Sequence, residues 1–151
     1  MAVRKISEKP VIETANTRYL IHVSSYDTGG AISLYQALFK PIGKSLNLHY
    51  HKQLTETFTI LHGRFLFHIN GEEYELGAND TVVVRPMEIH GFRAVVPNSE
   101  MLISFSDSLN RDDFFVELAN VVNSGKTLDG PDREAFYERF DQYYPSTDRK
   151  N

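Results

Sequence analysis

The chain has 151 residues, of which 41% are apolar and 12% aromatic, enough for the core of about one domain. The net charge is -4, so the chain does not have the excess of basic residues that is typical of a nucleic-acid-binding protein. The absence of cysteine excludes disulfides and thiolate metal ligands. Because no apolar run is long enough for a membrane span or a signal peptide, we expect a cytoplasmic protein with neither a membrane nor a nucleic-acid partner.

Short segments rich in β-branched and aromatic residues recur after a polar N-terminal arm, with turn residues between them. Asn70-Gly71 is the strongest hairpin signal, because both residues tolerate a positive φ. The segment 31–40 fits a helix or a strand, and the turn signals on both sides favour a strand. We expect strands over 17–25, 31–40, 47–51, 56–61, 64–70, 72–76, 81–84, 89–95 and 101–106. Many short strands at even spacing are typical of a sandwich or a closed barrel.

The pattern changes after residue 107, where apolar residues recur at helical spacing. It predicts one helix over 112–122 and a second that starts at Pro131 and is closed by Pro145. The apolar stripes consist of Phe114, Phe115, Leu118, Val121 and Val122, and of Ala135, Phe136, Phe140 and Tyr143. Both stripes are too apolar to face water, so we expect the tail to cover the outside of a sheet; a lid over the barrel mouth is the alternative. The prediction is one domain over 1–151, with a barrel over about 15–106 and a helical tail over about 109–144.

Two histidines on one predicted strand could bind a metal. His49 and His51 alternate, so their imidazoles share a face and can converge on one ion. Glu56 has the wrong parity for that face unless the loop over 52–55 re-aims it. A carboxylate among two or three neutral imidazoles suits Fe(II), Mn(II), Ni(II), Co(II) or Zn(II). Taken alone, such a histidine pair in a β protein is more often at the surface or half-buried than in a metal site.

The segment 43–63 resembles the first conserved motif of the cupin superfamily, with every anchor at the family's spacing. These anchors are Gly43, His49, His51, Glu56 and Gly63. Gly77 and His90 match the second motif, whereas Met87 replaces the glycine of its Pro-x-Gly turn and Ala94 replaces its asparagine. The resemblance covers about residues 30–106.

This resemblance implies an all-β fold, a double-stranded β-helix or jelly-roll cupin barrel, here followed by two C-terminal α-helices. It also implies one divalent transition metal (Fe, Mn, Ni, Zn, Co or Cu) with one or two coordination positions left open. The implied ligands are His49, His51, Glu56 and His90.

Several apolar side chains could line a cavity beside the metal, although simple core packing explains them equally well. Those with the strand parity of a ligand are Phe58, Ile60 and Phe92, and a further wall could come from Tyr35 and Phe39. Arg64 and Arg85 could bind the carboxylate of a ligand, but we expect both side chains to be exposed to solvent instead. We expect ordinary strand histidines at His22, His62 and His68.

The function we expect is that of a metal-dependent, oxygenase-like enzyme of the quercetin dioxygenase-like group, acting on a small, largely apolar or aromatic compound. The alternatives are a small-molecule binding or sensing cupin without catalysis, and a metal-dependent isomerase of sugars or keto acids. An isomerase needs a general base and polar groups, which an apolar lining disfavours. Apolar sheet edges and the arm around Val11 and Ile12 predict a homodimer.

Overall fold

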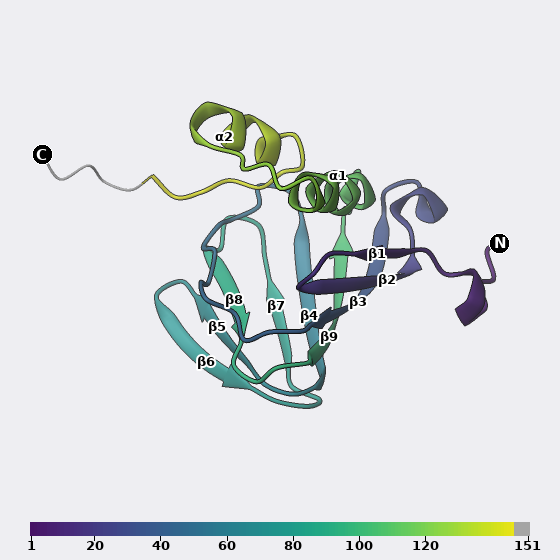
Figure 1. The fold of residues 1–151 in the computed structure, drawn as a ribbon, viewed down its shortest axis with the longest axis horizontal. Coiled ribbons are helices and arrows are strands. Elements are labelled where there is room, and N and C mark those ends of the chain that lie inside the picture. Colours follow the sequence, from purple (N-terminus) through teal and green to yellow (C-terminus); the bar gives the residue numbers. More distant parts are fainter. Residues whose placement is uncertain (147–151) are drawn as a thin grey trace, which may run out of the picture.

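The computed structural model describes residues 1–146 and contains two antiparallel sheets and two α-helices (Figure 1). The larger sheet has the strand order β1-β2-β3-β9-β4-β7 and the smaller one β6-β5-β8. The strands are β1 (Val11–Glu13), β2 (Thr17–Val23), β3 (Ile32–Phe39), β4 (Thr55–His62), β5 (Phe65–Ile69), β6 (Glu72–Leu76), β7 (Thr81–Val84), β8 (His90–Ala94) and β9 (Ser99–Ser106). The predicted all-β jelly roll with two C-terminal helices is confirmed.

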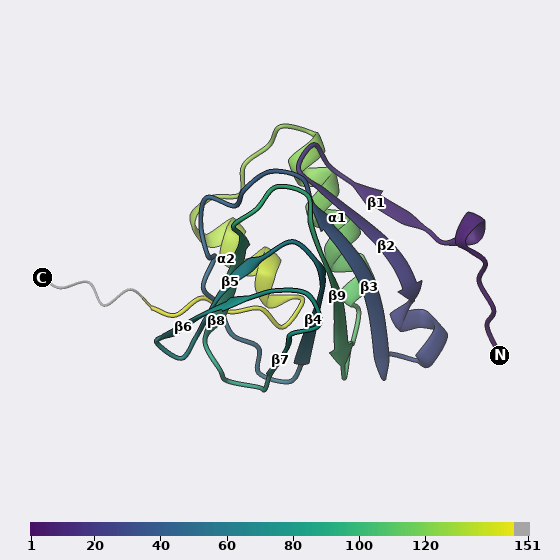
Figure 2. The same ribbon diagram turned by 90° about the horizontal axis from the view of Figure 1, so that it is seen from below.

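The core lies between the two sheets, which face each other (Figure 2). Alternate residues of β4 point inward, so that Glu56, Phe58 and Ile60 are buried. Aromatic rings from opposite sheets meet there: the ring of Phe58 lies 5.1 Å from that of Phe67, centroid to centroid. Each fully buried ring contributes roughly 1.5–3 kcal/mol of burial free energy before entropy is subtracted. One face of β4 therefore carries both the core and a carboxylate.

The expected strand over 47–51 is wrong, because this segment forms only two isolated bridges. His49 pairs with His90 on one side, and Tyr50 pairs with Tyr143 on the other. Asn47 has a φ of 52°, which interrupts an extended conformation. The N-terminal arm also contains a strand that was not among the expected ones, β1, which pairs with β2 of the same sheet.

The helices are α1 (Arg111–Asn123) and α2 (Gly130–Glu138), and none in the described residues is long and apolar enough to cross a membrane. The second ends well before Pro145, because Asp141 has a φ of 57° and turns the chain. Phe140 and Tyr143 therefore lie beyond the helix to which the sequence assigned them. In α1, the predicted stripe is only partly buried, and Val122 is 51% exposed.

The expected packing of the tail on the outside of a sheet is also wrong. The ring of Phe115 lies 4.6 Å from that of Tyr19 and 4.8 Å from that of Tyr35. Tyr35 pairs in register with Ile103, which pairs with Phe58, so all three point to the inner face. The six-stranded sheet is wider than the three-stranded one, and α1 covers the part of its inner face that the smaller sheet leaves open (Figure 1).

Two turn positions of the motifs have left-handed backbone. Gly63 has a φ of 76°, and a Cβ atom there would lie 2.8 Å from the Cα of Ser99, so only glycine fits between β4 and β5. Met87, where the second motif has glycine, has a φ of 72°. The turn before β8 therefore keeps a glycine-like conformation without a glycine.

Candidate metal centre

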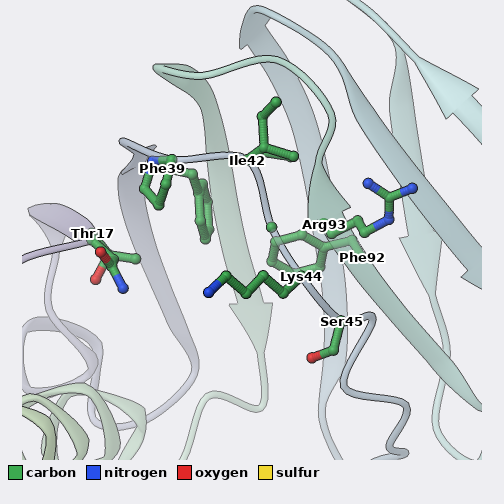
Figure 3. Close-up of a pocket in the computed structure, with 11 residues that line it drawn as sticks. Thr17, Phe39, Ile42, Lys44, Ser45, Phe92 and Arg93 are labelled. Atoms are coloured by element: carbon green, nitrogen blue, oxygen red, sulfur yellow. The ribbon is translucent and has the colours of Figure 1, made fainter.

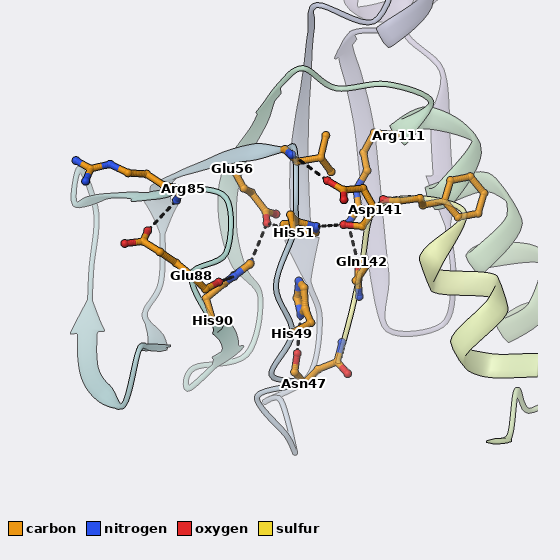
Figure 4. Close-up of polar contacts among 12 residues, drawn as sticks. Asn47, His49, His51, Glu56, Arg85, Glu88, His90, Arg111, Asp141 and Gln142 are labelled. Carbon is orange, nitrogen blue, oxygen red and sulfur yellow. Dashed lines mark hydrogen bonds and ion pairs between the residues drawn. The ribbon is translucent and has the colours of Figure 1, made fainter. Parts of the chain in front are cut away.

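Four side chains from three parts of the chain converge inside the barrel (Figure 4). His49 and His51 come from the irregular segment before β4, Glu56 from the start of β4, and His90 from the start of β8. One possible ligand atom of each lies within 4.8 Å of the others, and the four residues are 0–7% exposed. The structure thus brings together all four ligands that the cupin resemblance implied.

The three imidazole rings are oriented alike by backbone carbonyls. Each Nδ1 lies 2.6–3.0 Å from a carbonyl oxygen, which can only accept a hydrogen bond, so the bond requires a hydrogen on Nδ1. The carbonyls belong to Asn47 for His49, Asp141 for His51 and Glu88 for His90. Each Nε2 is then the available ligand atom, and those of His51 and His90 lie 3.2 and 3.1 Å from Oε2 of Glu56.

Glu56, His49 and His90 differ in how burial and neighbouring charges shift their pKa values. Burial raises the pKa of the Glu56 carboxyl, but hydrogen bonds and charges from His51 and His90 together bring that pKa well below its usual value. Burial, followed by the neighbouring His90 and His51, lowers the pKa of His49 to about 3. Burial also lowers the pKa of His90, but its interactions with Glu56 outweigh that effect and raise it. A carboxylate and a neutral His49 are the forms that bind a metal.

The loop between His51 and Glu56 is fixed by Asp141, a residue of the C-terminal tail. Oxygens of its carboxylate accept hydrogen bonds from the amides of Lys52, Gln53 and Leu54 at 3.0, 2.8 and 2.9 Å. This loop re-aims Glu56, as the sequence required. The sequence analysis missed Asp141, because 85 positions separate it from Glu56 and its only local signal is the tolerance of aspartate for positive φ.

The apolar residues predicted to line a cavity divide into two groups. Phe58, Ile60 and Tyr35 are fully buried in the core, with the ring of Phe58 6.4 Å from that of His90. Phe39 and Phe92 line a pocket of about 470 Å³ (Figure 3). The polar groups of this pocket belong to Asn16, Thr17, Lys44, Ser45 and Arg93. None of the four clustered residues lines this pocket, and the ring of Phe92 lies 5.2 Å from that of Phe58.

The remaining candidates are surface or half-buried residues. Arg64 forms an exposed ion pair with Glu75, and Arg85 is exposed. His62 is exposed, whereas His22 contacts Lys9 and Gln36 and His68 lies 4.0 Å from Glu73. None of these side chains belongs to the cluster of four.

Comparison with known proteins agrees with this fold. Residues 37–103 match a family model described as the cupin domain. The structure of KdgF from Halomonas sp. is 19% identical and has a TM-score of 0.61, over 70% of this chain and 93% of that one. A predicted oxalate decarboxylase from Thermotoga maritima is 22% identical with a TM-score of 0.59, over 70% of this chain and 98% of that one.

A third similar structure is Pac13, described as a unique nucleoside dehydratase, with 14% identity and a TM-score of 0.56 over 75% of this chain and 88% of that one. At these identities the likeness concerns the fold alone. Comparison with curated protein sequences gave no match. The family match spans 67 of the 151 residues, and the solved structures agree with it in fold.

Proposed function

We propose that this cupin-fold chain is a metal-dependent enzyme that acts on a small, largely apolar or aromatic compound. In this proposal one divalent transition metal is bound by His49, His51, Glu56 and His90. The observation that carries it is the orientation of the three imidazoles. Each Nδ1 is hydrogen-bonded to a backbone carbonyl, which leaves the Nε2 atoms to converge toward the carboxylate of Glu56. We further propose oxygenase-like chemistry, as in the quercetin dioxygenase-like group.

The donor set fits a divalent ion. Nε2 lone pairs and a carboxylate oxygen repel one another unless a proton or a cation lies between them. Ligands at about 2.0–2.2 Å from one ion can lie at most about 4.4 Å apart, so atoms within 4.8 Å need only a small inward movement. A bound ion of this kind would supply Lewis acidity and, if redox-active, one-electron chemistry. The enclosing residues exclude bulk water and fix the imidazole tautomers.

The pocket beside Phe39 and Phe92 supports an aromatic or apolar substrate. Two phenyl rings 5.5 Å apart form its apolar wall, and Lys44 extends toward Thr17 across it (Figure 3). A flat apolar molecule with one anionic or hydroxyl group matches this combination. No clustered residue lines the pocket, and a row of ring contacts runs from Phe92 through Phe58 to His90, so the proposal requires these rings to move for substrate and metal to meet.

A second candidate is a metal-dependent lyase or isomerase acting on a polar substrate. Its support is the polar rim of the same pocket, where Asn16, Thr17, Lys44 and Ser45 offer several hydrogen-bonding groups. The names of two similar structures, a nucleoside dehydratase and a predicted oxalate decarboxylase, point in the same direction. This reaction class differs from oxygenation because it consumes no dioxygen.

Metal analysis and oxygen uptake test the proposal together. The protein is purified, its metal content measured, and the metal-free form reconstituted anaerobically with Fe(II) before a panel of phenolic, aromatic and keto compounds is screened for oxygen consumption. Oxygenase chemistry predicts uptake that depends on both the metal and the compound. Turnover of a compound under anaerobic conditions would instead favour the lyase or isomerase.

A matched pair of histidine variants controls for nonspecific metal binding. His51→Ala should abolish stoichiometric binding, whereas His62→Ala should not, because His62 is exposed and lies outside the cluster. Retention of wild-type metal affinity by His51→Ala would refute the ligand assignment. Stoichiometric metal without turnover of any compound in either atmosphere would favour the binding or sensing role.

A further inference from the structure

The chain after α2 lies directly against the segment that carries His49 and His51. We call residues 139–145 the C-terminal strap. Tyr50 and Tyr143 exchange two backbone hydrogen bonds, of 2.8 and 2.9 Å, and their rings stack with centroids 5.6 Å apart. The ring of Tyr144 lies 6.1 Å from that of His49. The strap therefore adds a short pairing partner on the side of this segment away from β8.

Asp141 makes the contacts that join the strap to the centre (Figure 4). Its backbone carbonyl accepts the hydrogen of Nδ1 of His51 at 2.6 Å. Its carboxylate accepts three consecutive amide hydrogens, those of residues 52–54, and the residue is only 5% exposed. A single residue thus orients one imidazole and fixes the loop that leads to Glu56.

Arg111, at the start of α1, holds the strap on both sides of Asp141. Its guanidinium donates to the carbonyl of Phe140 at 3.2 Å and to the side-chain oxygen of Gln142 at 2.9 Å. It is 4% exposed and stacks 3.8 Å from the ring centroid of Phe114. Among the described residues no carboxylate forms an ion pair with this arginine, so its hydrogen bonds to the strap and its ring contacts are what compensate its burial.

We infer that Asp141 is a positioning residue of the centre, so that the cluster of four has its ligand geometry only while the strap is docked. The inference rests on the proposed metal-binding function and extends it, because it makes the helical tail part of the site. The physical reason is that an imidazole ligand needs its second nitrogen held by an acceptor, and Asp141 supplies that acceptor for His51 from the far end of the chain. The same residue fixes the loop on which the direction of Glu56 depends.

The test compares full-length Asp141→Ala and Asp141→Asn with Asp132→Ala, which removes an exposed carboxylate from α2. Co(II) is the probe, with affinity measured by competition against a chelator. Asp141→Ala should weaken binding about 10- to 100-fold and change the Co(II) absorption spectrum. Asp141→Asn should weaken it less, because asparagine keeps an acceptor oxygen and tolerates positive φ. Asp132→Ala should match the wild type in both readouts.

Nitrogen-15 NMR of the metal-free protein gives a readout that does not depend on metal. At pH about 9, His51 of the wild type should carry its hydrogen on Nδ1, bonded to the backbone carbonyl of Asp141. Asp141→Ala keeps that carbonyl but removes the carboxylate that holds the strap on residues 52–54, so the carbonyl should move away and the Nε2 tautomer should become populated. Should Asp141→Ala fail to fold, Asp141→Asn provides both measurements. Wild-type affinity, spectrum and tautomer in a folded Asp141 variant would overturn the inference. A wild type that binds no Co(II), with a tautomer that shifts in the variant, would overturn the proposed function while leaving the positioning of His51 in place.

Discussion

Oε2 of Glu56 lies 3.1 Å from Nε2 of His90, and both side chains are almost entirely shielded from solvent. In the absence of metal this contact favours an ionised Glu56 and a protonated His90, since the interaction with Glu56 raises the pKa of His90 despite its burial. His49 behaves in the opposite way, because burial and the two neighbouring histidines lower its pKa to about 3. The cluster should therefore couple folding and metal binding to pH.

The stability of the metal-free protein should fall on acidification below about pH 6.5. Between 6.5, the ordinary pKa of His49, and about 3, its folded-state pKa, the unfolded chain binds a proton that the folded chain does not. The free energy of unfolding then decreases by up to about 1.4 kcal/mol per pH unit. Glu56, whose pKa is lowered, adds to this loss below about 4.5.

Urea unfolding of the metal-free protein between pH 4 and 8 measures this slope. His62→Ala should leave it unchanged, because His62 is exposed and outside the cluster. His90, whose pKa is raised, contributes its stabilisation fully below about 6.5 and loses it as the pH rises through its folded-state pKa. A free energy of unfolding that does not change between pH 6.5 and 4.5 would contradict the assignment of a neutral, buried His49.

Metal binding should release protons over the pH range in which His90 is protonated in the metal-free protein. A ligand imidazole must be neutral, and contact with Glu56 raises the pKa of His90 in the metal-free protein. Affinity for Zn(II) should therefore rise with pH until His90 is neutral in the metal-free state. Titration calorimetry in buffers of different ionisation enthalpy counts the protons released; binding without proton release would show that His90 is already neutral or does not ligate the metal.

Phe115→Ala should destabilise the fold by about 3–5 kcal/mol. Its ring lies on the inner face of the larger sheet, within 5 Å of the rings of Tyr19 and Tyr35, and only 7% of the residue is exposed. Val116→Ala, on the next position of the same helix, should change the free energy of unfolding by less than about 1 kcal/mol because Val116 is 43% exposed. Equal effects of the two substitutions in urea unfolding would contradict this packing of α1.

Sequence periodicity predicted the features that depend on a single strand. It could not predict contacts between segments that are far apart in the sequence. Period-two alternation correctly placed Glu56 and Phe58 on one face of β4, because strand geometry alone sets that parity. The position of α1 could not be read in the same way, since it depends on how much of one sheet the other leaves uncovered. The contact between His51 and Asp141 joins residues 90 positions apart and had no periodic signal at all.

Met87→Gly should stabilise the protein by up to about 1 kcal/mol. Met87 has a φ of 72°, a conformation that costs a side chain with Cβ roughly 1–2 kcal/mol, and 61% of the residue is exposed, so little packing is lost. The greater freedom of glycine in the unfolded chain offsets part of this gain. Asn79→Gly is the matched control, because Asn79 has the same φ of 72° and asparagine tolerates it. A lower free energy of unfolding for Met87→Gly would show that its side chain has a role that outweighs the strain.

We predict a homodimer that forms through the edge of the larger sheet at β1. β1 is the last strand in the order of that sheet, so among the described residues no further strand pairs with its outer side, where only the carbonyl of Glu13 accepts a hydrogen bond, from the side chain of Asn123. Val11 on this strand is 44% exposed, and pairing with a second copy would cover it.

Val11→Glu should weaken a dimer formed at β1, because two carboxylates would meet near the paired edges. Val83→Glu, on β7 at the opposite edge, should leave it intact although Val83 is 54% exposed. Light scattering coupled to size exclusion measures the mass of each form. A monomeric wild type at working concentrations would refute the homodimer, and dissociation by Val83→Glu alone would place the interface at β7.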